Sequence, residues 1–227
     1  MSEVSAITPV KHKLLREAIR EQLLDLIISG ELSPGSRLVE AEVAGRLKTS
    51  RIPVREAFLD LSRDGWVDLR ARQGAWVHIP QDREVDDFYD VRGALEAESA
   101  RLAALRARPE ELAKLRELLE EGFVHIGVAD YVKAGEANEI LHRAITQTAG
   151  NELLATLTSG MEQRVRWSFR QVVEVRGVNS WDEHSAILNA IIDHNPEAAA
   201  ASMRLHINAT RDAFHSAKAG GTAHITR

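Results

Sequence analysis

The chain of 227 residues contains no cysteine and no long apolar run. Without cysteine the protein can form neither a disulfide nor a thiolate metal site, which fits a reducing compartment. A membrane-spanning helix needs about 18 or more consecutive apolar residues, and no such run is present. The N-terminal residues also lack the apolar segment after a basic start that marks a secretion signal. We therefore expect a cytoplasmic protein with no membrane partner.

An excess of positive charge is also lacking, since the formal net charge is −5. That total is unpromising for a nucleic-acid partner, but the charge is unevenly distributed. Residues 1–80 carry 12 Lys/Arg and 11 Asp/Glu, whereas residues 81–227 carry 17 and 23. The near-neutral first third can have a basic face, while the acidic remainder would be repelled by phosphate. The asymmetry predicts two parts with different partners.

The first eighty residues have the pattern of three helices followed by a hairpin. Apolar residues at spacings of three and four predict a helix over residues 11–29, and a short helix is expected around residues 40–47. Ser50 is a good N-cap for a third helix, whose buried stripe is Val54, Ala57, Phe58 and Leu61. Alternation predicts strands at residues 66–70 and 75–79, around a turn centred on Gln73 and Gly74. This order predicts a winged helix-turn-helix domain over residues 1–80.

From residue 82 onward the pattern is helical almost to the end. The expected helices cover residues 82–107, 109–127, 129–149, 151–173, 180–194 and 196–217. Ser180 and Glu183 have the spacing of a capping box, and Pro196 suits the first turn of the last helix. The tail from Ala219 is expected to fray. The predicted fold class is therefore mainly α, with an all-helical bundle over residues 81–227 after the winged domain.

The stretch KTSRIPVREAF places two arginines on one face of the third helix. Arg51 and Arg55 are four residues apart, next to the buried stripe but outside it. The second helix of a helix-turn-helix enters the DNA major groove, and the planar fork of arginine matches guanine edges and phosphates. The plain alternative is a pair of solvated charges, with Arg55 paired to Asp60 or Glu56. The order of elements around the arginines favours DNA binding. The predicted DNA-binding residues are Ser50, Arg51, Arg55, Arg72, Gln73 and Gly74.

The run GSRLVEAEVAGRLKTSRIPVREAFLDLSRDGWVDLRARQGAWV resembles the DNA-binding domain of the GntR family of bacterial transcription regulators. The resemblance covers the first domain and is closest around SRIPVREAF and LSRDGWV. It implies that the recognition-helix arginines, the wing glycine region and residues near Ser50 contact DNA. Ala41 is a departure, since relatives often carry a DNA-contacting Arg or Gln there. Operator preference therefore cannot be transferred from those relatives.

Three histidines of the second part fall in predicted helices, at His142, His184 and His206. Asn138 precedes His142 by four residues, so the two side chains share a helix face. Neutral imidazoles are good ligands for Zn²⁺ and similar ions, and an amide oxygen is a weaker ligand. From spacing alone, each histidine is more simply a hydrogen-bonded core or surface residue.

Residues 82–217 resemble the helical FCD effector domain that follows the DNA-binding domain in the FadR subfamily of GntR proteins. Its motif is an Asp or Asn four residues before a His, followed by two further histidines, which match Asn138, His142, His184 and His206. The resemblance implies a divalent metal, Zn²⁺ or Ni²⁺, that helps to hold a small carboxylate effector. Asn138 in place of the commoner Asp removes one negative charge from the ligand set. Six helices would suit the shorter, VanR-like branch.

Arg92, in the first helix of the bundle, is a candidate effector-binding residue. Its guanidinium can face the cavity and pair with a carboxylate. The equally weighted alternative is an intrahelical ion pair with Glu96, four residues later.

Together these patterns predict a ligand-responsive transcription regulator rather than an enzyme. We expect a homodimeric repressor that leaves double-stranded operator DNA when a small organic acid binds near the metal. Three alternatives stay open: a metal-dependent hydrolase, a sensor in which the ion itself is the signal, and an effector bound without metal. The chain has no HExxH motif to support the hydrolase.

Overall fold

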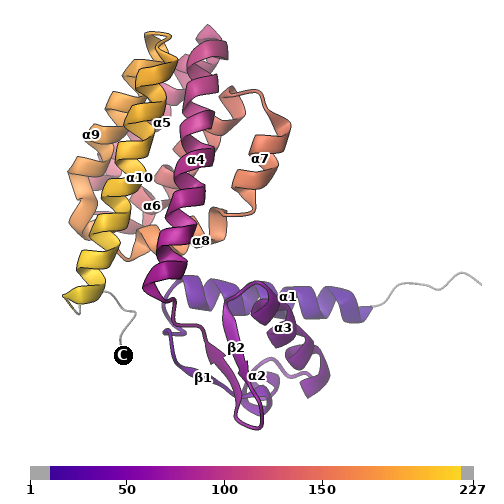
Figure 1. The fold of residues 1–227 in the computed structure, drawn as a ribbon. Coiled ribbons are helices and arrows are strands. Elements are labelled where there is room, and N and C mark those ends of the chain that lie inside the picture. Colours follow the sequence, from indigo (N-terminus) through magenta and orange to yellow (C-terminus); the bar gives the residue numbers. More distant parts are fainter. Residues whose placement is uncertain (1–10, 221–227) are drawn as a thin grey trace, which may run out of the picture. The chain divides into compact units, whose positions relative to one another are not determined.

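The computed structural model describes residues 11–220. Backbone contacts divide the chain into two compact units, one ending at Ile79 and the other beginning at Pro80 (Figure 1). Most of the tail that was predicted to fray, residues 221–227, lies outside the described residues. Among the described helices, none is long and apolar enough to cross a membrane.

The first unit contains three helices and a small sheet. Its elements are α1 (Lys11–Ile28), β1 (Arg37–Leu38), α2 (Glu40–Arg46), α3 (Arg51–Arg63), β2 (Val67–Arg70) and β3 (Gly74–Val77). The strands lie in the order β1-β3-β2 and are antiparallel, with Arg70 opposite Gly74 at the tip. This arrangement confirms the predicted winged helix-turn-helix. Strand β1 was not predicted, because two residues are too few to show alternation.

The core of the first unit is built by α1, α3 and the inner faces of the strands. The predicted stripe of α3 is fully buried, as are apolar residues of α1 and the wing. In α1, Ile19, Leu23 and Ile27 are buried at spacings of four, as the apolar pattern predicts, whereas Leu15 is 39% exposed. The buried stripe of α3 leaves its other face, which carries Arg51 and Arg55, exposed to solvent.

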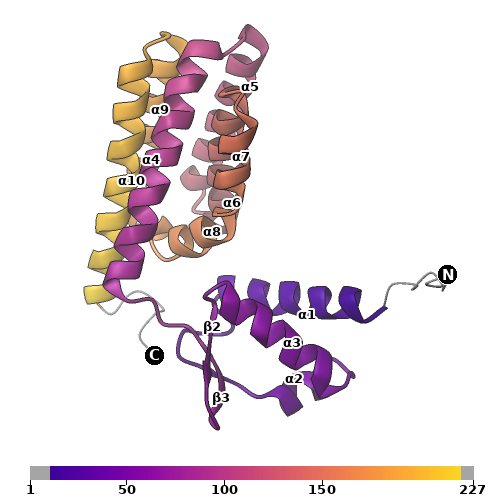
Figure 2. The same cartoon turned by 45° about the vertical axis from the view of Figure 1, so that its right-hand side comes forward.

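The second unit is a bundle of seven helices in the part of the chain that the structure describes. They are α4 (Asp82–Arg106), α5 (Pro109–Gly127), α6 (Tyr131–Thr148), α7 (Glu152–Ser159), α8 (Glu162–Arg170), α9 (Val173–Ile192) and α10 (Pro196–Ala219). The two longest, α4 and α10, lie side by side along their length in both views (Figure 1, Figure 2). The predicted mainly helical fold class is thus confirmed.

Two details of the predicted bundle are wrong. The helix predicted over residues 151–173 is two helices, broken at Gly160 and Met161. The helix predicted to start at Ser180 begins earlier and continues through a kink at Gly177, whose φ is 35° and ψ −127°. The count of six helices that favoured the VanR-like branch therefore does not hold.

Three helices of the bundle, α6, α7 and α10, begin at a residue whose side chain caps the helix. Asp130, Asn151 and Asn195 each accept a hydrogen bond from the backbone N–H three residues later. Pro196 occupies the first turn of α10, as predicted. The capping box predicted for Ser180 and Glu183 is wrong, because both residues lie inside α9.

Gly122 of α5 packs directly under the indole of Trp181, which is fully buried. A Cβ at this position would overlap three atoms of the indole ring. We expect Gly122→Ala to lower the free energy of unfolding by about 1–3 kcal/mol, because the indole must move within a packed core. Gly127→Ala on the same helix is the matched control, since no atom lies within 4 Å of its added methyl. Urea denaturation followed by tryptophan fluorescence measures both, and equal stability of the two variants would refute this packing argument.

Candidate functional site

The exposed face of α3 carries the two arginines singled out from the sequence. Arg51 and Arg55 both lie in solvent at the N-terminal part of the helix, next to exposed Ser50. Ser50 occupies the N-cap position, but its hydroxyl makes no capping hydrogen bond. Its side chain and the first backbone N–H groups of the helix thus remain available to an anion such as a phosphate.

Arg55 forms an ion pair with Glu40, a partner that was not predicted from the sequence. Its Nε and Nη2 atoms each donate a hydrogen bond to Glu40 of α2, at 2.8 Å. The proposed alternative partners, Asp60 and Glu56, are thus not used; Asp60 instead pairs with Arg16 and Arg63. The hydrogen bond from Arg55 lowers the pKa of the Glu40 carboxyl below its ordinary value. The pair fixes the direction of the Arg55 guanidinium.

The wing tip brings the other three predicted contact residues into solvent. Arg72, Gln73 and Gly74 are all exposed. Arg72 has a φ of 63° and Gly74 a φ of 101°, and the latter strongly favours glycine. Because Gly74 lacks a side chain, a partner can approach the backbone of the wing closely.

A hollow of about 790 Å³ lies between α2, α3 and the wing. Its charged lining includes Arg37, Glu40, Arg51, Arg55, Arg70 and Arg72. Two of these arginines flank the indole of Trp76, with the Cζ of Arg70 4.8 Å and that of Arg37 5.9 Å from the ring centroid. Sequence reasoning missed Arg37, because its nearness to the wing depends on the unpredicted strand β1. The hollow is a strongly basic surface on a unit whose total charge is near zero.

In the bundle, the three predicted histidines converge although they come from α6, α9 and α10. Candidate ligand nitrogens of His142, His184 and His206 all lie within 4.8 Å of one another, and all three residues are buried. The Nε2 atoms of His142 and His184 are 3.0 Å apart. Such a set of imidazoles has the composition and spacing of a transition-metal centre.

Two glutamates orient the outer nitrogens of this cluster. The Nδ1 of His142 lies 2.5 Å from Oε2 of Glu96, and the Nδ1 of His206 lies 2.8 Å from Oε2 of Glu183. Each carboxylate selects the tautomer with the proton on Nδ1 and leaves Nε2 for a metal. Burial alone would raise the pKa of the Glu96 carboxyl, but Arg92 and His142 together hold it well below its usual range.

The remaining features of the cluster also fit a divalent cation. Burial lowers the pKa of His184 and of His206 well below its ordinary value, and neighbouring imidazoles and guanidinium groups add to this effect. The neutral imidazole is the form that binds a metal. Asn138 is 1% exposed, and its Oδ1 atom is buried without a hydrogen-bond partner. This unpaired oxygen, one turn before His142, suits a fourth ligand.

Arg92 forms the ion pair that was weighed from the sequence and keeps two nitrogens without a partner. Its Nε donates to Oε1 of Glu96 at 2.7 Å, so the intrahelical pair is formed. Its Nη1 and Nη2 atoms are nevertheless buried without a partner, in a side chain that is 1% exposed. Unpaired buried guanidinium nitrogens are costly, and a carboxylate matches their fork with two parallel hydrogen bonds.

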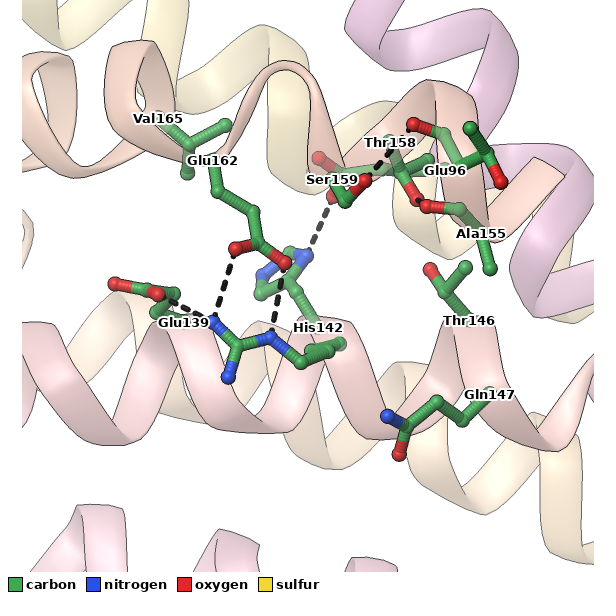
Figure 3. Close-up of a pocket in the computed structure, with 12 residues that line it drawn as sticks. Glu96, Glu139, His142, Thr146, Gln147, Ala155, Thr158, Ser159, Glu162 and Val165 are labelled. Atoms are coloured by element: carbon green, nitrogen blue, oxygen red, sulfur yellow. Dashed lines mark hydrogen bonds and ion pairs between the residues drawn. The ribbon is translucent and has the colours of Figure 1, made fainter. Parts of the chain in front are cut away.

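A pocket of about 320 Å³ reaches this centre from α6, α7 and α8. Glu96 and His142 belong to its lining, together with the hydroxyls of Thr146, Thr158 and Ser159 (Figure 3). Nearer the solvent, Arg143 donates to both Glu139 and Glu162. The pocket has the size of a site for a small molecule, and its lining combines polar and charged groups with apolar surface.

Comparison with known protein families matches both units. Residues 15–77 match the model of bacterial regulatory proteins of the gntR family, and residues 87–209 match the FCD domain. The chain belongs to the GntR family and carries an FCD domain. It is therefore a transcriptional regulator and not an enzyme, so the hydrolase alternative is set aside. A GntR-type DNA-binding domain implies DNA as a partner, and an FCD domain implies a small-molecule effector.

Individual relatives agree with this assignment. The chain is 30% identical over 190 residues to the Nta operon transcriptional regulator of Aminobacter aminovorans, covering 80% of this chain and 86% of that one. It is 28% identical to the transcriptional repressor RspR of Escherichia coli K12, over 67% and 64% of the two chains. Among solved structures, E. coli McbR/YncC has a TM-score of 0.71 at 22% identity, over 90% and 98%. A GntR protein from Rhodococcus sp. RHA1 has a TM-score of 0.73 at 23% identity, over 89% and 98%. The structural likeness supports the fold.

Proposed function

We propose that this GntR protein is a cytoplasmic, homodimeric repressor that a small carboxylic acid releases from its operator. The acid binds in the bundle beside a divalent metal held by histidines. One observation carries this proposal: three buried imidazoles converge next to a guanidinium whose Nη1 and Nη2 atoms have no partner. A metal and a carboxylate would satisfy both groups at once.

The exposed α3 face and the wing supply the DNA contacts in this proposal. Arg51 and Arg55 reach base edges and phosphates in the major groove, with Ser50 beside a phosphate. Arg72, Gln73 and Gly74 at the wing tip reach the neighbouring backbone or groove. The solvent exposure of all six residues and the basic hollow between α3 and the wing support this assignment.

His142, His184 and His206 would hold the metal, with Asn138 as a fourth, weaker ligand. Nitrogen ligands suit Zn²⁺ and Ni²⁺, which the uncharged donor set does not distinguish. When bound, the ion acts as a Lewis acid that attracts the carboxylate of the effector. Glu96 and Glu183 position the imidazoles, and Arg92 offers its free nitrogens to the same ligand.

In this proposal, a homodimer places two DNA-binding domains on one operator. A pair of recognition helices fits a pseudo-palindromic site and doubles the contacts. The effector can change operator affinity only if it binds DNA-competent and incompetent arrangements differently, typically by about 1–3 kcal/mol of coupling. Light scattering of the purified chain measures its oligomeric state, and a monomer at micromolar concentration would contradict this part of the proposal.

The decisive experiment is release of operator DNA. An operator is first selected from random duplexes, and its complex with metal-loaded protein is then titrated with a panel of small carboxylic acids. At least one acid is expected to weaken the complex by about 5- to 150-fold. Release by metal alone, without any acid, would support a metal sensor instead. If no acid changes the affinity and none raises the melting temperature, the proposed effector class is wrong.

A further inference from the structure

The charges around the histidine cluster identify the class of acid that the bundle takes, an inference that rests on the proposed function. Arg92 is paired with Glu96, and Arg176 is paired with Glu183. Each pair brings together one positive and one negative group. An imidazole binds a metal in its neutral form, so three histidine ligands and the amide of Asn138 would add no charge to these two pairs. The protein groups around the cluster therefore supply no spare negative charge.

A divalent metal would add two positive charges that no protein ligand offsets. An aspartate in place of Asn138 would offset one of them, but an amide offsets none. Leaving a charge uncompensated in a low-dielectric interior is costly, so the bound ligand must supply the missing negative charge. The residues His184, His206 and Asn138 are each 1% exposed, so bulk solvent and salt would screen this charge little.

The unpaired hydrogen-bond donors lead to the same requirement independently. The Nη1 and Nη2 atoms of Arg92 are buried and have no partner, and the same holds for Nε of Arg176. Arg92 presents its two free nitrogens as a fork, which matches the two oxygens of a carboxylate. The effector carboxylate that binds the metal does not have to pair with Arg92 as well. The two free nitrogens of Arg92 therefore suit a second anionic group on the same ligand.

The charged side chains at the solvent end of the pocket do not change the net charge counted around the histidine cluster. Glu139 and Glu162 both accept hydrogen bonds from Arg143, so this trio has a net charge of −1. The side chains of Glu139, Glu162 and Arg143 are 20%, 32% and 43% exposed. Because they contact water, solvent and salt screen their charges.

We propose that the effector of this protein is a dicarboxylate, with one carboxylate for the metal and the other for the free nitrogens of Arg92. The pocket of about 320 Å³, which reaches the cluster at His142 and Glu96, has room for a diacid with a short carbon chain. Asn138 is the specificity-determining residue, because its missing charge raises the charge required of the ligand from one to two.

The test compares ligands that differ by one charge. Malonate, succinate and glutarate are each titrated into metal-loaded, full-length protein by calorimetry, beside their own monomethyl esters. At least one diacid is expected to bind tenfold or more tightly than its ester. The same pair is then measured with Asn138→Asp, a nearly isosteric change, at confirmed full metal loading. The added charge is expected to reduce the preference for the diacid at least tenfold.

Each other outcome has a defined meaning. Esters that bind as tightly as every diacid, or an Asn138→Asp preference equal to that of the wild type, would overturn the dicarboxylate inference while leaving the proposed function standing. Tighter binding of inorganic phosphate than of every diacid would overturn it in favour of a phosphorylated ligand. If neither these acids nor any acid of the operator-release panel binds, both the inference and the proposed function fail.

Discussion

Replacement of Arg55 with alanine is expected to weaken binding to the selected operator by about tenfold to a hundredfold, and replacement of Arg51 to do the same. Both guanidinium groups lie on the exposed face of α3, and Arg55 is oriented by its two hydrogen bonds to Glu40. Because the guanidinium of Arg55 is held in a fixed direction, its remaining N–H groups lose little entropy when they pair with a base edge, and its removal is costly. Mobility-shift titrations at constant salt measure the dissociation constants.

Arg63→Ala provides the matched control for these variants. Arg63 lies at the C-terminal end of the same helix, its side chain is 76% exposed, and it is outside the predicted contact set. We expect its replacement to leave operator affinity almost unchanged. Equal weakening by Arg51→Ala, Arg55→Ala and Arg63→Ala would indicate a loss of general charge instead of a groove contact. Unchanged affinity for both Arg51→Ala and Arg55→Ala would refute the assignment of α3 as the recognition helix.

The second large effect is expected at the histidine cluster. Protein purified without chelator is expected to contain about one metal ion per chain, and His206→Ala to contain almost none, because three good ligands become two. Added Zn²⁺ or Ni²⁺ should raise the melting temperature of the wild type, with about 2.7 kcal/mol of stabilisation at a hundredfold excess over the dissociation constant. The variant should show no such rise. Mass spectrometry of metal content and calorimetric melting measure both.

His215→Ala is the control on the same helix. His215 pairs with Asp86 through Nε2 at 2.8 Å and is not part of the cluster. Its replacement should leave metal content at the wild-type level. Metal content that is equal in the wild type and in His206→Ala would show that the cluster does not bind the ion. Circular dichroism of each variant checks that the bundle remains folded.

The sequence predicted most elements where local chemistry decides them. The buried stripe of α3, the start of α10 at Pro196 and the Gly-tipped wing follow from periodicity and turn chemistry. The break inside residues 151–173 does not, because the apolar residues continue across it. Val165, Trp167 and Phe169 of α8 are all buried, which is not the spacing of a single helix face. Their burial reflects packing against other helices, which no local pattern records.

The candidate metal site also depends on both local sequence and helix packing. Its histidines are separated by about forty and twenty residues, so only the resemblance to FCD domains brought them together before the structure was known. Glu96 was considered solely as a partner of Arg92, and Glu183 as a helix cap. Their contacts with His142 and His206 join residues 46 and 23 positions apart. Such pairings depend on how helices pack, which sequence spacing does not contain.

The Glu40–Arg55 pair has a consequence for how a repressor of this kind would search a genome. Because Arg55 is paired with Glu40, the carboxylate opposes the attraction of the guanidinium to DNA phosphates at any sequence. The Nη1 nitrogen of Arg55 can still donate to one correctly placed acceptor on the DNA. Glu40 thus lowers the affinity for nonspecific DNA more than the affinity for the operator. The ratio of the two affinities, which is the selectivity of the protein, increases.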